Sequence, residues 1–142
     1  MNQVKSALIV DDTASARAVL RDMLTELGFA HIHEASDGRQ AAEFLATTTV
    51  DIVLCDQIMT DMSGQMLLAH LRADGRLATL PVIMVSALSN ISDVDAALET
   101  GATDYLVKPV SFRKLRRKVE DALYGSTEQI ELEPAQFDFL TS

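Results

Sequence analysis

Short apolar runs alternate with helical patterns along this chain. Five runs have the length and composition of buried strands: residues 7–10, 31–35, 52–55, 80–86 and 104–108. Between and after them, apolar residues recur at helical spacing. The helices are expected to begin at Thr13, near Gly38, at Ser63, at Asn90 or Ser92, and at Ser111, and to end near Gly28, Thr47, Asp74, Gly101 and Gly125. Such alternation predicts an α/β fold, a doubly wound five-stranded parallel sheet with five helices on its two faces.

Polar residues stand where four of these strands end. Asp11 and Asp12 follow the first strand and Asp56 follows the third. Ser86 ends the fourth strand, and Lys108 ends the fifth. Side chains just past the carboxyl ends of parallel strands line the binding crevice of such folds. We therefore expect these residues to form one site.

The residue types at this edge indicate phosphoryl chemistry. Three carboxylates gathered without compensation would repel one another and raise one another's pKa. Mg²⁺, which takes one or two carboxylates and keeps several waters, would resolve this repulsion. Asp56 would then be an ionised nucleophile of the kind that forms an aspartyl phosphate. Lys108 and the Ser86 hydroxyl would hold the other phosphoryl oxygens.

Four motifs in this order resemble the receiver domain of two-component response regulators, specifically the stand-alone CheY type. They are Val10-Asp11-Asp12, Asp56 with Met59 and Gly64, Ser86-Ala87, and the run from Gly101 to Pro109. The resemblance covers about residues 5–125. Any one motif is weak, but four at this spacing are highly specific. The strand order 2-1-3-4-5 is that of CheY and is carried over from the resemblance.

The resemblance also implies the chemistry of the acidic residues. Asp56 would accept a phosphoryl group from a phosphohistidine on a histidine kinase or a histidine phosphotransfer protein. Asp11, Asp12 and Asp56 would hold Mg²⁺, with the backbone carbonyl of Ile58 as a further ligand. Lys108 would contact the phosphoryl group.

Three further features of the resemblance concern signalling. The Lys108–Pro109 peptide bond is expected to be cis. Ser86 and Tyr105 would form the switch pair. The Ser86 hydroxyl would move toward the phosphate, and the Tyr105 ring would turn inward. Ala87, which follows Ser86, would also line the phosphoryl site. The added charge would bias the surface of the fourth helix, fifth strand and fifth helix, which would bind a downstream protein.

The chain departs from the family pattern at three places. Thr60 stands where proline is usual, which predicts a looser loop. Ser86 replaces the more common threonine. Ile58 and Leu88, two residues after Asp56 and Ser86, are apolar where the family often has polar residues that position hydrolytic water. We therefore hypothesise slow self-dephosphorylation.

Composition limits the function classes. The 142 residues suit one domain, and a net charge of −9 disfavours binding to nucleic acid or an anionic membrane. No segment approaches the roughly 20 apolar residues of a membrane span, so we expect a cytoplasmic protein. The lone cysteine, Cys55, is expected to be a small buried hydrophobe.

Two charged segments leave alternatives open. We assign residues 1–125 to the receiver domain and residues 126–142 to an acidic tail, either disordered or a docking segment. The last helix carries a basic face: Arg113, Lys114, Arg116, Arg117 and Lys118. This face either is solvated or pairs with acidic Asp93, Asp95 and Glu99 of the fourth helix in a homodimer.

Two other functions compete with the regulator. A Mg²⁺-dependent phosphohydrolase would carry its nucleophile at the end of the first strand, two residues before a second aspartate, but Asp11 and Asp12 are adjacent. A receiver-like scaffold that no longer accepts phosphate would lack a required group, and every required group is present. A P-loop nucleotidase is excluded because its glycine-rich motif does not occur.

Overall fold

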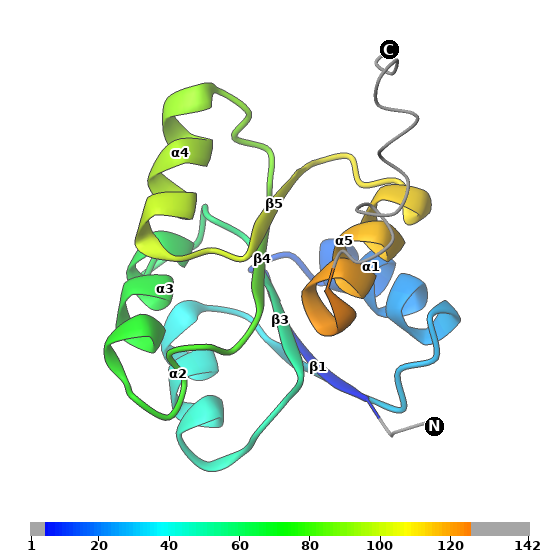
Figure 1. Cartoon of the computed structure of the whole chain (residues 1–142), viewed down its shortest axis with the longest axis horizontal. Helices are drawn as coiled ribbons and strands as arrows, with labels where there is room; N and C mark the ends of the chain where they lie inside the picture. Colours follow the sequence, from blue (N-terminus) through cyan, green and yellow to red (C-terminus); the bar gives the residue numbers. More distant parts are fainter. Residues whose placement is uncertain (1–4, 126–142) are drawn as a thin grey trace.

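Five parallel strands form a single sheet in the computed structural model, which describes residues 5–125 (Figure 1). The strands are β1 (Ser6–Val10), β2 (His31–Ala35), β3 (Ile52–Cys55), β4 (Val82–Ser86) and β5 (Asp104–Val107). Their order across the sheet is β2-β1-β3-β4-β5. The predicted fold class and strand order are confirmed.

Helices cover both faces of the sheet. In Figure 1, α1 (Ala14–Glu26) and α5 (Phe112–Tyr124) lie on one face. The other face carries α2 (Gly38–Thr47), α3 (Gly64–Ala73) and α4 (Ile91–Thr100). The three-layer arrangement leaves the two ends of the strands uncovered by helices.

Alternate residues of each central strand enter two separate cores. Leu8 and Val10 pack into the core beneath α2, α3 and α4. Ala7 and Ile9 pack into the core beneath α1 and α5. Because both faces of β1 are covered, its apolar run has no polar alternation. Each fully buried leucine or isoleucine stabilises the fold by roughly 1.5–3 kcal/mol relative to its exposed state.

Short polar side chains begin four of the helices. Asp37, Ser63, Asn90 and Ser111 each accept a hydrogen bond from a backbone N–H in the first turn. Such a cap typically contributes about 1 kcal/mol. Asn90, rather than the alternative Ser92, is therefore the N-cap of α4.

Strand β4 begins later than the sequence pattern predicts. The N–H of Leu80 donates to the carbonyl of Leu77 at 3.2 Å, which holds Leu80 in a turn. Pro81 has no N–H to give to a strand ladder. The ordered strand therefore begins at Val82. β5 likewise ends at Val107, one residue before the predicted end.

Two further expectations concern the whole chain. The tail of residues 126–142 lies outside the described residues. Within residues 5–125, no helix is long and apolar enough to cross a membrane.

Candidate functional site

The register of the sheet brings the predicted aspartates together. Val10 of β1 is paired with Cys55 of β3, and the N–H of Asp56 donates to the Val10 carbonyl at 2.9 Å. Asp11 and Asp56, the next residues of the two strands, therefore lie side by side. Carboxylate oxygens of Asp11, Asp12 and Asp56 all lie within 4.8 Å of one another. Asp11 and Asp56 are buried, at 1% and 7% exposure, whereas Asp12 is exposed.

Lys108 bridges the two buried carboxylates. Its Nζ lies 2.8 Å from Oδ2 of Asp11 and 3.1 Å from Oδ2 of Asp56. Lys108 follows β5, and its peptide bond to Pro109 is cis, the isomer that the resemblance implies. Three carboxylates and one ammonium formally leave two negative charges uncompensated at this edge of the sheet.

The pKa of Asp11 is lowered, because the carboxylates at this site are not left without compensation. Burial alone would raise the pKa of Asp11. Hydrogen bonds from Lys108 and Thr13, together with the charge of Lys108, outweigh the burial and favour the ionised form. Burial would lower the pKa of Lys108, but its contacts with Asp11 and Asp56 raise it. The ion pair is thus mutually stabilised.

Two residues that the sequence analysis did not assign to the site hold Asp11 in place. Thr13 donates to Oδ1 of Asp11 from its backbone N–H (2.9 Å) and from its hydroxyl (2.7 Å). Arg17 of α1 donates to the backbone carbonyl of Asp11 at 2.6 Å and is fixed in turn by Glu34 of β2 at 2.8 Å. No sequence motif marks Arg17, because its role depends on how α1 packs against the end of β1.

The loop after β3 holds the buried Asp56 carboxylate in place. The N–H of Ile58 donates to Oδ1 of Asp56 at 3.2 Å, and the Ile58 side chain is largely exposed. At the end of the loop, the N–H of Gly64 donates to the Gln57 carbonyl at 3.0 Å. A Cβ at Gly64 would lie only 2.1 Å from the Asp56 carbonyl oxygen, so this close approach requires glycine. The looser loop predicted from Thr60 stays a prediction.

The proposed switch residues both form hydrogen bonds with the backbone of Leu88. Ser86 is fully buried, and its hydroxyl oxygen accepts a hydrogen bond from the N–H of Leu88 at 3.3 Å. The hydroxyl of Tyr105 donates to the carbonyl of Leu88 at 2.9 Å. The Tyr105 ring is buried, so it already lies inward in this structure. Ala87, between Ser86 and Leu88, is exposed.

Cys55 takes no part in this chemistry. It is buried in β3 directly before Asp56. Burial raises the pKa of its thiol, and the neighbouring carboxylates of Asp56 and Asp11 raise it further. The prediction of a small buried hydrophobe is confirmed.

The acidic cluster is suited to a small divalent cation. Oxygens that share one Mg²⁺ at about 2.0–2.1 Å lie at most about 4.2 Å apart, so the observed spread requires only a small approach of the side chains. Two uncompensated negative charges match one divalent charge. Receiver domains generally bind Mg²⁺ at such an acidic pocket.

Comparison with known proteins assigns the class. The family model described as response regulator receiver domain matches residues 7–120. The chain therefore belongs to the response regulator receiver family of two-component signalling. Members of this family are phosphoryl-accepting signalling domains and not conventional enzymes.

Individual relatives agree with this assignment. The chain is 38% identical over 113 residues to the chemotaxis protein CheY of Pseudomonas aeruginosa, covering 80% of this chain and 91% of the relative. It is 35% identical over 120 residues to chemotaxis protein CheY-3 of Vibrio cholerae, covering 84% and 92%.

Solved structures show the same likeness. A putative response regulator from Chloroflexus aurantiacus superposes with a TM-score of 0.81 at 30% identity, covering 85% of this chain and 98% of that one. The receiver domain of a signal transduction histidine kinase from Syntrophus aciditrophicus gives 0.79 at 32% identity, covering 93% and 99%.

Proposed function

We propose that this protein is a single-domain response regulator that accepts a phosphoryl group on Asp56 from a phosphohistidine. A carboxylate oxygen of Asp56 forms a bond to phosphorus, the phosphorus–nitrogen bond breaks, and the imidazole leaves with the electron pair. The observation that carries this proposal is the placement of Asp56. It lies at the end of β3, between the ammonium of Lys108 and the carboxylates of Asp11 and Asp12.

The acidic cluster supports three of the proposed metal ligands, and the family resemblance implies the fourth. Asp11, Asp12 and Asp56 would hold Mg²⁺, with the backbone carbonyl of Ile58 as a further ligand. When bound, the ion supplies positive charge to the oxygens of the transferred group. Lys108 supplies a second positive charge and orients the phosphoryl group. Thr13 and Arg17 keep Asp11 in position.

Ser86, Ala87 and Tyr105 would transmit the modification. A phosphoryl group adds a charge of about −1.5 to −2 and three strong acceptor oxygens. It would draw the Ser86 hydroxyl toward it, with Ala87 lining the phosphoryl site. Because the Leu88 N–H donates to Ser86 and the Leu88 carbonyl accepts from Tyr105, a movement of Ser86 would shift the residue that holds the Tyr105 ring. The switch therefore leads directly to β5.

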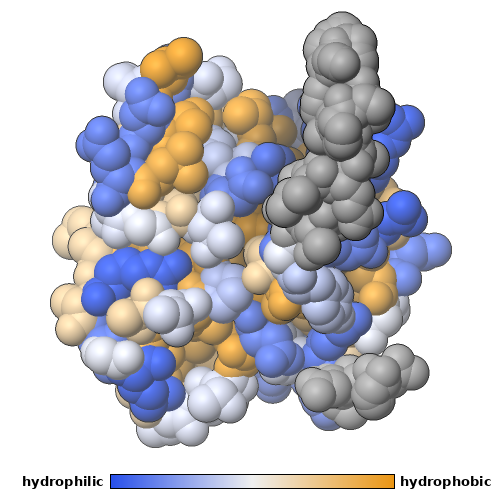
Figure 2. All heavy atoms as spheres, viewed as in Figure 1, coloured by the Kyte–Doolittle hydropathy of each residue, from blue (hydrophilic) through white to orange (hydrophobic). Residues whose placement is uncertain are grey.

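The surface of α4, β5 and α5 is the proposed binding site for a downstream protein. Ile91 and Leu98 of α4 are exposed, and so is Val107 of β5. Figure 2 shows hydrophobic residues in a stripe along α4, beside hydrophilic ones. Contiguous exposed apolar side chains with a polar rim are typical of protein contacts. The upstream partner would be a sensor histidine kinase or a histidine phosphotransfer protein.

A homodimer could use the same surface. The acidic residues of α4, Asp93, Asp95 and Glu99, would face the basic residues of α5 in a second copy, giving a self-complementary two-fold contact. Sedimentation of the phosphorylated and unphosphorylated protein tests this idea. We propose the cytoplasm as the location, where ATP-dependent kinases supply phosphohistidine. Neither nucleic acid nor membrane is a proposed partner.

Intact mass measurement tests the phosphorylation. Wild-type protein incubated with Mg²⁺ and a small-molecule phosphodonor should gain one phosphoryl group, and Asp56→Asn should gain none. Asp61→Asn is the matched control, because Asp61 is an exposed aspartate of the same loop. Its positive φ of 66° is a conformation that asparagine tolerates. No gain in wild type, with Mg²⁺ shown to bind, would favour a receiver-like scaffold.

A further inference from the structure

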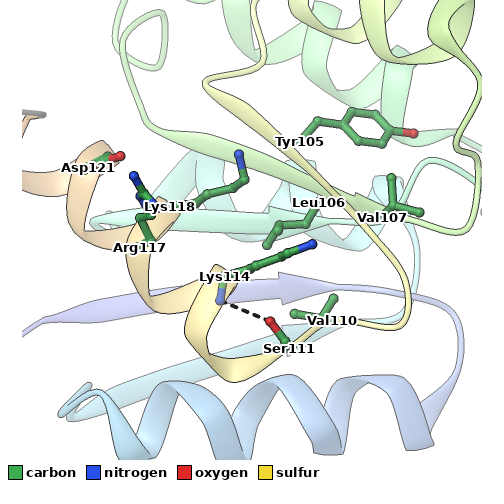
Figure 3. A pocket seen from close by; sticks show the side chains of 9 residues that line it. All are labelled: Tyr105, Leu106, Val107, Val110, Ser111, Lys114, Arg117, Lys118 and Asp121. Atoms are coloured by element: carbon green, nitrogen blue, oxygen red, sulfur yellow. Dashed lines mark hydrogen bonds between the residues drawn. The ribbon is translucent and has the colours of Figure 1, made fainter. Parts of the chain in front are cut away.

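A groove lies between β5 and α5. It has a volume of about 540 Å³. Leu106, Val107 and Val110 supply apolar side chains, and Lys114, Arg117 and Lys118 line it from α5 (Figure 3). In Figure 3, Lys114 and Lys118 extend from the helix toward β5. The groove therefore combines an apolar lining with a positively charged side.

Much of this positive charge is not compensated within the domain. Lys118 pairs with Asp104 at 2.9 Å, and Asp121 is the one carboxylate in the lining. Among residues 5–125, neither Lys114 nor Arg117 forms an ion pair. A ligand that fits this groove should carry both carboxylates and apolar side chains.

We propose that the chain's own tail, residues 126–142, docks in this groove. The tail contains four acidic residues and no lysine or arginine. Ile130 and Leu132 alternate with Glu131 and Glu133, the pattern of a segment with one apolar and one acidic face. The apolar residues would cover the apolar lining, and the glutamates would face Lys114 and Arg117.

The length of the tail allows this placement. Helix α5 has 13 residues and is about 20 Å long. Five to seven extended residues span about 17–23 Å, so Leu132 can reach back to the start of α5 and Ile130 to its first turn. Gly125 has φ +87° and ψ 170°, a conformation nearly restricted to glycine, which turns the chain away from the helix axis.

The outer side of strand β5 offers backbone hydrogen-bond partners as well. Within the described part of the chain, β5 is hydrogen-bonded only to β4, so its other edge is unpaired. Unpaired edge strands readily accept an added extended segment. A tail lying along β5 would thus gain hydrogen bonds in addition to its apolar and ionic contacts.

Docking would regulate access to the surface proposed for the downstream protein, because β5 and α5 belong to both. This consequence rests on the proposed function, whereas docking itself does not. A tail bound in the groove would exclude a partner, and a partner would have to displace it.

Paramagnetic relaxation in the full-length protein tests docking without any phosphorylation. A nitroxide is attached to Ala135→Cys, since Cys55 is buried and stays unlabelled. The amide signals of Val107, Val110 and Lys114 should lose most of their intensity. Those of β2, at the opposite edge of the sheet, should keep theirs.

Two comparisons decide the outcome. The signals of β5 and α5 should be restored when the labelled protein also carries Ile130→Asp and Leu132→Asp. They should also be restored in 1 M salt, which shortens the Debye length to about 3 Å. A sample mixing spin-labelled protein with unlabelled ¹⁵N protein should show no broadening, because docking is within one chain. Broadening in that mixture, broadening unaffected by the two aspartates, or no broadening at all would overturn the proposal.

Discussion

The ammonium group of Lys108 lies 3.1 Å from Oδ2 of Asp56, across the edge of the sheet from β5 to β3. The same ammonium also contacts Asp11 at 2.8 Å, so one cation balances two buried carboxylates. Lys108 therefore stabilises the site, but its single positive charge does not neutralise the acidic cluster. Lys108 and a divalent cation act on the same oxygens, and each should weaken the attraction of the other.

Substitution of Lys108 by methionine should strengthen Mg²⁺ binding. Removing one positive charge next to the cluster raises the local negative charge, and a change of about 1–2 kcal/mol corresponds to roughly tenfold in affinity. Isothermal titration with Mg²⁺ measures this change. Lys118→Met is the control, because Lys118 pairs with Asp104 and not with the acidic cluster. Unchanged or weaker binding by Lys108→Met would contradict the proposed position of the ion.

Alanine at position 64 should destabilise the domain by about 3 kcal/mol. The added Cβ would lie 2.1 Å from the carbonyl oxygen of Asp56, so the backbone at the site must shift. Urea unfolding of Gly64→Ala gives the loss of unfolding free energy. Gly75→Ala is the matched control: nothing lies within 4 Å of its added Cβ, and no loss is expected. Equal stability of the two variants would show that the loop relaxes freely.

The contribution of Glu34 to stability should disappear in acid. Hydrogen bonds from Arg21 and Arg17 lower the pKa of Glu34 below its ordinary value of 4.5, although burial opposes this. A lowered folded-state pKa stabilises the protein above pH 4.5, and this stabilisation is lost as the pH falls through the folded-state pKa. Glu34→Gln should therefore cost about 1 kcal/mol at neutral pH and less near pH 3.

Chemical denaturation at several pH values tests this expectation. Glu43→Gln is the control, because Glu43 is exposed and forms no ion pair within residues 5–125. A Glu34→Gln deficit that grows toward low pH would have the wrong sign and would contradict the ion-pair account.

The phosphorylated protein should lose its phosphoryl group slowly, because the residues two positions after Asp56 and after Ser86 are apolar. Ile58 is 53% exposed beside the site, and Leu88 is half-buried. Neither can orient a water molecule for attack on phosphorus. Ile58→Asn adds a polar group at this place and should shorten the phosphoryl lifetime on the order of tenfold. The decay of the phosphorylated mass with time measures it, and Met66→Asn, an exposed residue of α3, is the control.

The sequence was most informative where one pattern had one structural solution. Uninterrupted apolar runs followed by aspartates predicted β1 and β3, because both faces of these strands are covered and their ends meet at one edge. The alignment of Asp11 with Asp56 then followed from the parallel register.

Features that depend on packing between elements could not be predicted. The contact of Arg17 with the Asp11 carbonyl requires the placement of α1 against β1. The sequence placed Lys108 at the site, but the lowered pKa of Asp11 depends on its hydrogen bonds with Lys108 and Thr13, which only the packing fixes. Thr13 is the N-cap residue of α1, as expected, but its hydroxyl donates to Asp11 and accepts no hydrogen bond from the first turn of the helix.

Reductive trapping of the phosphorylated protein tests the central claim most directly. Borohydride converts an aspartyl phosphate, but not a free carboxylate, into homoserine, and peptide mass spectrometry then locates the altered residue. Our account predicts homoserine at position 56 alone. It also predicts that homoserine forms only when Mg²⁺ was present during the phosphorylation. Homoserine at Asp11, Asp12 or any other position, or a phosphoryl group that resists reduction, would contradict the assignment of Asp56 as the phosphoryl acceptor.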